Sequence, residues 1–150
     1  MSAGPDILQL AMKSLPHGPE FRFVDRMLSL TPGKEGVGEY RVRGDEYYLR
    51  GHLPGEPILP GVLLLEAGAQ VAGMVAQDDP ANPRWPRLKL TALRAVKISG
   101  AVHPGQTLRI EVAIIGQLDS LIQARISASA AGANVLSAEL TLSGETSSRV

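Results

Sequence analysis

The segment GVLLLEAGAQVAGMVAQ, residues 61–77, is the feature that most restricts the fold. It is long enough for a helix, has few β-branched residues, and follows Pro60, which suits a first helical turn. Because it is apolar nearly all round, such a helix must be buried on most sides. A sheet wrapped closely around it would be helped by its small residues, which are Ala67, Gly68, Ala69, Ala72 and Gly73.

The rest of the chain predicts the sheet that would bury this helix. Residues 21–30 and 36–44 suggest a hairpin around the turn at 31–34, whereas 45–50 is ambiguous. Four later segments have strand character, and a short helix capped by Asp6 precedes them all. These strands are expected at 88–98, 107–119, 121–130 and 134–143. Antiparallel strands with short connections and separate helices indicate an α+β fold. The loop at 78–87 is too short to separate two domains, so residues 1–150 are expected to form one domain.

Composition excludes several classes of function. Fifteen acidic residues balance fifteen basic ones, which gives no electrostatic reason to expect nucleic acid or an anionic membrane as the main partner. The chain has no cysteine, which excludes disulfides, thiol catalysis and cysteine metal sites. The first twenty residues do not form a signal peptide, and no apolar run reaches the ~18 residues that span a bilayer. A cytoplasmic protein is expected.

Two polar residues, Glu66 and Gln70, interrupt the apolar helix. They are four residues apart and therefore share a face. Burying a carboxylate favours its neutral form, which is a proton donor near neutral pH, and Gln70 could orient it. The alternative is a structural ion pair between Glu66 and an arginine of a strand, with Gln70 facing solvent. The helix pattern alone does not decide between them.

His52 precedes this helix in the loop GHLPGEPILPG, in which six of the eleven positions are glycine or proline. Such a loop loses little entropy on ordering and can hold a histidine in place. It also leads to a helix start, where free N–H groups near Gly61 and Val62 could polarise a carbonyl oxygen. A lone loop histidine is more often structural. His17, His52 and His103 lack regular ligand spacing, so no metal site is expected.

The segment GHLPGEPILPGVLLLEAGAQ resembles the signature of the FabZ-type 3-hydroxyacyl-[acyl-carrier-protein] dehydratases of bacterial fatty acid synthesis. Upstream, LPHGPEFRFVDR is similar to that family's Leu-Pro-His and Val-Asp-Arg motif, and HPGQTLRIEV resembles its Pro-Gly-Asp strand start. The resemblance covers about residues 14–143 and implies the hotdog fold, a long helix wrapped by an antiparallel sheet. It also implies homodimers paired edge to edge, some of which form hexamers, with the active site at the dimer interface.

The resemblance assigns roles to particular residues. His52 matches the catalytic base that would remove the C2 proton of a (3R)-3-hydroxyacyl thioester, and Glu66 the acid that would protonate the leaving hydroxyl. The N–H of Gly61 would bind the thioester oxygen, and no cofactor or metal is implied. An apolar tunnel for the acyl tail is expected, with candidate wall residues that could equally be ordinary core. These candidates are Leu53, Ile58, Leu59 and Val62.

The chain departs from the family pattern in three places. Gly18 and Pro19 replace a basic-aromatic pair, Leu53 replaces a phenylalanine, and residues 97–102 lack the usual arginines. This loss of basic charge leaves open whether the acyl group is carried by an acidic carrier protein or by coenzyme A. Two other functions remain open at this stage: a hotdog acyl-thioesterase and a non-catalytic acyl-binding subunit.

Overall fold

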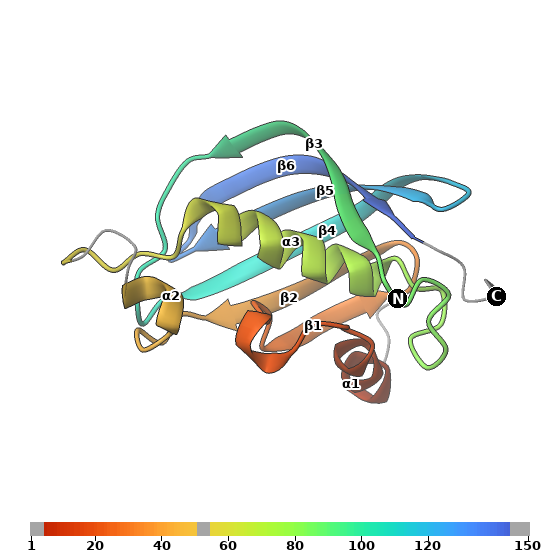
Figure 1. Ribbon diagram of the computed structural model, residues 1–150, viewed down its shortest axis with the longest axis horizontal. Coiled ribbons are helices and arrows are strands. Elements are labelled where there is room, and N and C mark those ends of the chain that lie inside the picture. The colour runs from red at the N-terminus through yellow and green to blue at the C-terminus, as the bar shows by residue number, and fades with distance from the viewer. Residues whose placement is uncertain (1–4, 51–54, 145–150) are drawn as a thin grey trace.

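The computed structural model describes residues 5–50 and 55–144, which form one six-stranded antiparallel sheet around a central helix. In spatial order the strands are β1-β2-β4-β5-β6-β3, and the sheet curves around α3 (Figure 1). The elements are α1 (Pro5–Lys13), a 3-10 helix η1 (Pro19–Phe21), β1 (Arg26–Thr31), β2 (Glu35–Arg41), α2 (Tyr47–Arg50), α3 (Gly61–Val75), β3 (Lys89–Ile98), β4 (Thr107–Leu118), β5 (Leu121–Ala130) and β6 (Ala133–Ser143). The predicted α+β arrangement, a sheet wrapped around a long helix, is confirmed.

The α3 helix is buried because its neighbours cover it on several sides. Nine of its fifteen residues are buried, and it packs against β2, β4, β5 and β6. Gly68 allows the closest approach, since a methyl group at that position would collide with the side chain of Ile126 on β5. Gly73 is different, because a methyl group there would lie 4.0 Å from Leu88 and fit without a clash. The sequence therefore predicted the close packing correctly at one of the two glycines.

The strands supply the other half of the core through alternating residues. On β4 the inward side chains are Leu108, Ile110 and Val112, and β5 continues this face with buried residues from Ile122 to Ala130. Each fully buried Leu, Ile or Val contributes roughly 1.5–3 kcal/mol from removal of apolar surface. The alternation also fixes the register, because a slip by one residue would turn this whole face to solvent.

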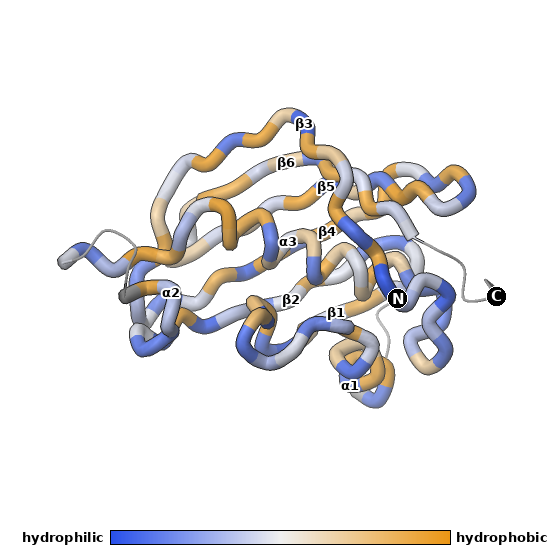
Figure 2. Tube along the Cα trace, in the orientation of Figure 1, coloured by the Kyte–Doolittle hydropathy of each residue, from blue (hydrophilic) through white to orange (hydrophobic). Residues whose placement is uncertain are grey.

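The β3 strand ends the sheet and has no neighbour on its outer edge. It pairs with β6 only, and all ten of its residues are exposed. Hydrophobic residues recur along it (Figure 2), and its exposed large side chains are Leu90, Leu93, Val96 and Ile98. An open apolar edge of this length is a site for pairing with another strand.

The predicted elements differ from the structure mainly within the first fifty residues. Asp6 does not cap α1, because the helix begins at Pro5 and Asp6 lies in its first turn, and β2 ends at Arg41 rather than at residue 44. The four later strands and the central helix lie within two residues of their expected bounds. Strand β1 begins only at Arg26, because the N–H of Phe23 and the carbonyl of Phe21 bond to the Gln70 side chain instead of to a strand. The ambiguous segment 45–50 contains the short helix α2. In the described part of the chain, no helix has the length and apolar character that crossing a membrane requires.

Candidate active site

Glu66 lies on α3 beside two polar partners. Its Oε2 accepts a hydrogen bond of 3.0 Å from Nε2 of Gln70, and it lies 3.4 Å from Nε2 of His17. The Glu66 side chain is 23% exposed and that of His17 is 28% exposed. The carboxyl group is thus half-buried and fixed through one oxygen, yet solvent or a ligand can still reach it.

Gln70 is held in one orientation by the backbone of the segment before β1. The residue is 1% exposed, its Oε1 accepts from the N–H of Phe23 at 2.9 Å, and its Nε2 donates to the carbonyl of Phe21 at 2.8 Å. The oxygen must face the N–H donor, so the amide nitrogen must face Glu66. The solvent-facing Gln70 of the structural alternative is therefore wrong. The same alternative paired Glu66 with an arginine of a strand. That pairing is wrong too, since the Glu66 carboxyl group contacts His17 and Gln70.

His17 is the residue that the sequence analysis left without a role. The side chain of Arg22 donates from Nε to the His17 carbonyl at 2.7 Å, and the imidazole ring stacks on Phe21 with centroids 6.1 Å apart. Its Nδ1 is buried and has no hydrogen-bond partner among the described residues. The one sequence signal that could have singled it out is its place in the Leu-Pro-His motif, because no local pattern connects residues 49 positions apart.

The other predicted site residues lie near the start of α3. Gly61 is the first helical residue, and a methyl group on it would come within 3.0 Å of Ile98 on β3. The Val62 side chain is 70% exposed, whereas Leu59 is buried in the core and its N–H bonds to the carbonyl of Val102. His52 and Leu53 lie outside the described residues. Their roles, and those of Gly61, Val62 and Leu59 toward a substrate, stay predictions.

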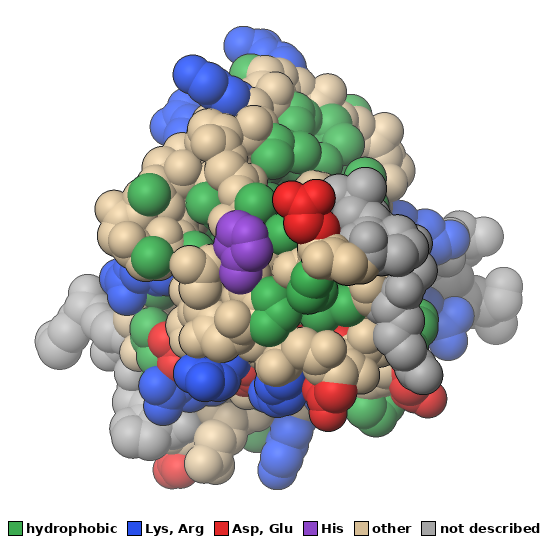
Figure 3. Space-filling model, turned by 90° about the vertical axis from the view of Figure 1, so that its left-hand side faces the viewer, with side chains coloured by type: hydrophobic (Ala, Val, Ile, Leu, Met, Phe, Trp, Pro, Cys, Tyr) green, Lys and Arg blue, Asp and Glu red, His purple; other side chains and the backbone are tan. Residues whose placement is uncertain are grey.

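Figure 3 shows the end of the molecule at which α3 begins. Hydrophobic side chains are exposed over the centre of this face, next to histidine and acidic side chains, while lysines and arginines lie toward its upper and lower edges. Among residues 5–50 and 55–144, no group of three His, Asp or Glu side chains is placed to share a metal ion.

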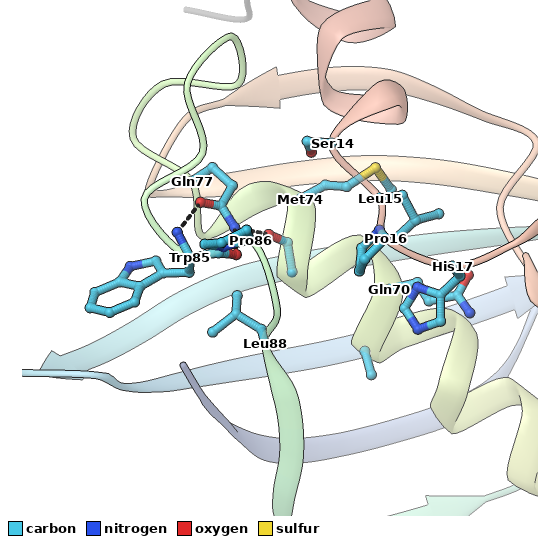
Figure 4. Close-up of a pocket in the computed structure, with 12 residues that line it drawn as sticks. Ser14, Leu15, Pro16, His17, Gln70, Met74, Gln77, Trp85, Pro86 and Leu88 are labelled. Atoms are coloured by element: carbon cyan, nitrogen blue, oxygen red, sulfur yellow. Dashed lines mark hydrogen bonds between the residues drawn. The ribbon is translucent and has the colours of Figure 1, made fainter. Parts of the chain in front are cut away.

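A pocket runs along α3 away from Glu66. Most of its lining is apolar, and part of it opens to solvent. His17 and Gln70 lie at one end and Gln77 and Trp85 at the other, with Met74 between them (Figure 4). Of the described residues on α3 and just after it that line the pocket, Gln70 and Gln77 are the polar ones. The arrangement therefore places a fixed carboxyl group beside a small, mostly apolar pocket.

A family model for FabA-like domains matches residues 15–139, which include His17, His52, Glu66 and all of the residues that line this pocket except Ser14. The chain belongs to the FabA-like family. Within this family it is similar to curated proteins named 3-hydroxyacyl-[acyl-carrier-protein] dehydratase FabZ. One from Roseiflexus sp. (strain RS-1) is 41% identical over 105 residues, 70% of this chain and 73% of that protein. Another, from Geotalea uraniireducens (strain Rf4), is 44% identical over 110 residues, 69% of this chain and 72% of that protein.

Solved structures extend the FabA-like comparison to the fold. A chain of the dehydratase heterocomplex ApeI:P from Xenorhabdus doucetiae matches with a TM-score of 0.77 at 18% identity, over 91% of each chain. The PaaI protein from the phenylacetic acid degradation operon of E. coli matches with a TM-score of 0.62 at 12% identity, over 79% of this chain and 78% of that one. At such identities the likeness concerns the fold alone, and it confirms the predicted hotdog architecture.

Proposed function

We propose that this protein is a FabZ-type dehydratase, which converts (3R)-3-hydroxyacyl thioesters into trans-2-enoyl thioesters in fatty acid or related lipid biosynthesis. The observation that carries the proposal is the Glu66 carboxyl group, fixed by Gln70 and His17 beside an apolar pocket. An oriented acid next to an apolar pocket suits chemistry near the thioester end of an acyl chain. The curated relatives with FabZ names support the same reaction.

The reaction removes one molecule of water and needs one base and one acid. His52 takes the proton from C2, and the electron pair of that C–H bond forms the C2–C3 double bond. The C3–O bond breaks, and the hydroxyl leaves as water with a proton from Glu66, directly or through a bound water. The N–H of Gly61, at the helix start, stabilises charge on the thioester oxygen. A well-placed acid or base contributes about 10²–10⁴-fold in rate.

Gln70 and His17 are positioning residues in this proposal. Both meet Oε2 of Glu66, so the other carboxyl oxygen is the one that faces the substrate. Because Gln70 is itself fixed by two backbone groups, the carboxyl loses little freedom when substrate binds. The acyl tail lies along α3, while Val62 and the loop with Leu53 contact the thioester end.

We further infer a homodimer formed through β3, in which His52 of one protomer serves Glu66 of the other. The open apolar edge of β3 supports this, because strand pairing there would cover Leu93 and Val96. A trimer of such dimers is the hexamer that the family resemblance implies.

Light scattering after gel filtration tests the dimer. The wild type should elute as a dimer, and Val96→Lys should shift it to monomer. A V96K protein that stays dimeric would place the interface elsewhere.

Turnover of a purified thioester tests the function itself. The wild type should produce the absorbance of a 2-enoyl thioester from a 3-hydroxyacyl-[acyl-carrier-protein], and His52→Ala should lose this signal while keeping its circular dichroism spectrum. Running the coenzyme A thioester in parallel identifies the carrier. Release of free thiol without enoyl product would instead indicate a thioesterase, and acyl binding without any turnover a binding subunit.

A further inference from the structure

All five phenylalanine and tyrosine residues of the chain meet in one cluster. Phe23 is its centre. Its ring is buried and meets three others edge to face, with centroids 4.9 Å away for Phe21, 5.4 Å for Tyr48 and 6.0 Å for Tyr40. Tyr47 packs on Tyr48 and is itself largely exposed. Edge-to-face contact is a geometry that aromatic rings favour, so the cluster fixes its members relative to one another.

One side of the cluster supports the acid-bearing helix. Phe21 and Phe23 bond through their backbone groups to the side-chain amide of Gln70. Gln70 in turn donates to the carboxyl group of Glu66. The imidazole of His17, which lies 3.4 Å from that carboxyl group, stacks on the Phe21 ring. Both polar neighbours of Glu66 are therefore held by the same aromatic cluster.

The other side of the cluster is tied to α2 by hydrogen bonds between side chains. The hydroxyl of Tyr40, on β2, donates to Oε2 of Glu46 at 2.8 Å. This uses its only proton, so the hydroxyl of Tyr48, on α2, is the donor in its contact with the Tyr40 oxygen. Glu46 is fixed by two backbone N–H groups, that of Arg43 at 2.9 Å and that of Gly44 at 2.6 Å.

Each of these three side chains has the protonation state that the series of bonds needs at neutral pH. Burial raises the pKa of Tyr48 to about 12 and that of Tyr40 well above its ordinary value, so both hydroxyls keep their protons. Burial acts against the charge of Glu46, but the hydrogen bonds that it accepts outweigh this and hold its pKa below the ordinary value. The order of donation therefore runs from Tyr48 to Tyr40 to Glu46.

The helix that is tied in this way leads directly to the proposed base. α2 ends at Arg50, two residues before His52, and lies at the same end of the molecule as the start of α3 (Figure 1). It has only four residues, and a helix of that length does not hold its direction without tertiary contacts. Leu49 supplies the apolar contact, since it is buried in the core, and the Tyr48 hydroxyl supplies the polar one.

We propose that Tyr48 is a positioning residue for His52, because its hydroxyl bond to Tyr40 sets the direction in which the chain leaves α2 toward the base. This rests on the proposed dehydratase function and deepens it. In the proposed dimer each site takes His52 from one protomer and Glu66 from the other. The cluster of one protomer therefore serves the base of one site and the acid of the other site, and Tyr48 acts only on the site that its own His52 serves.

The first test is the kinetics of Tyr48→Phe, which removes the hydroxyl and keeps the ring. With a 3-hydroxyacyl-[acyl-carrier-protein] substrate, kcat should fall about 10- to 100-fold while KM stays within about twofold, because the base is misplaced. Tyr40→Phe removes the same contact, so it should also lower kcat, and the double variant should lose no more than the worse single one. Tyr47→Phe, the same change at an exposed ring outside this series of bonds, should leave kcat unchanged.

Mixed dimers separate a positioning role from a general loss of stability. A protomer with His52→Ala, paired with one that carries Glu66→Gln, leaves one complete site per dimer, and the two protomers are purified together through different tags. Adding Tyr48→Phe to the protomer that supplies His52 should lower kcat about 10- to 100-fold. Adding it to the protomer that supplies Glu66 should leave kcat within about twofold. Equal loss in the two placements, or loss in neither, would overturn the proposal.

Hydrogen exchange gives a readout that needs no turnover. Tyr48→Phe should speed exchange in the peptide that covers residues 49–60 and leave that of α3 unchanged, and Tyr47→Phe should change neither. This result in a protein that eliminates water from no substrate would reject the dehydratase and keep the positioning of this segment by Tyr48. Elimination by Tyr48→Phe at the wild-type kcat would reject the role of Tyr48 and keep the dehydratase.

Discussion

Replacing Gln70 with leucine tests whether the amide network is what holds the acid-bearing helix to the segment before β1. Leucine is close in size to glutamine, so the substitution changes hydrogen bonding more than packing. It removes the acceptor of the Phe23 N–H, the donor to the Phe21 carbonyl, and the donor to Glu66. Of these three partners the Phe23 N–H is fully buried, and the other two are partly reached by solvent.

The expected loss of stability follows from these partners. An unsatisfied buried backbone group costs about 1–3 kcal/mol, and the partly buried Phe21 carbonyl should cost less than the Phe23 N–H. The free energy of unfolding should therefore fall by about 2–4 kcal/mol, a large part of the 5–15 kcal/mol that is typical of a domain. The activity of the remaining folded protein should fall as well, because Glu66 loses the amide that orients it.

Urea denaturation followed by circular dichroism measures this loss, with the slope m unchanged if the transition stays two-state. Gln123→Leu is the matched control, since this exposed glutamine should change stability by no more than about 0.5 kcal/mol. A loss below about 1 kcal/mol for Gln70→Leu would refute the reasoning, because it would mean that the backbone groups find other partners at little cost.

Three further predictions test the fold and the site. Gly68→Ala should destabilise the protein by about 1–3 kcal/mol through its collision with Ile126, and in urea denaturation the same change should cost less in an Ile126→Ala background, where the collision is gone. His17→Phe keeps the aromatic ring but loses Nε2, so kcat should fall about 10- to 100-fold with a shifted pH–rate profile and unchanged stability; a kcat within about twofold of the wild type would exclude a positioning role. Burial raises the pKa of Tyr48 to about 12, above its value of about 10 in the unfolded chain, so its contribution to stability is complete below about pH 10 and is lost as the pH rises toward 12. Tyr48→Phe should therefore weaken the alkaline fall in unfolding free energy, and an equal fall in both proteins would contradict this.

The sequence predicted those parts of the structure that depend on local pattern. Strands β4, β5 and β6 alternate between buried and more exposed residues over much of their length, and the central helix is apolar over most of its length, so their limits followed from local pattern. The shared face of Glu66 and Gln70 followed from their spacing of four residues, and the structure joins them by a hydrogen bond.

The parts that the sequence did not predict depend on contacts between distant residues. Residues 21–25 have the alternation of a strand, but the Phe21 carbonyl and the Phe23 N–H bond to Gln70, which is 47 positions from Phe23. The contact of His17 with Glu66 leaves no periodic signal in either segment. Likewise, the two hydrogen bonds between the Gln77 side chain and the Trp85 backbone span a proline-rich loop whose sequence indicates only that it is a loop.

The most direct test of the central claim is the turnover of a 3-hydroxyacyl-[acyl-carrier-protein] by the Glu66→Gln variant. Glutamine has nearly the same shape and can still accept the hydrogen bond from Gln70, but it has no proton to give to a leaving hydroxyl. The account predicts that this variant folds, binds acyl thioesters with the Kd of the wild type, and forms 2-enoyl product about 10²–10⁴-fold more slowly. Enoyl formation at the wild-type rate by Glu66→Gln would contradict it.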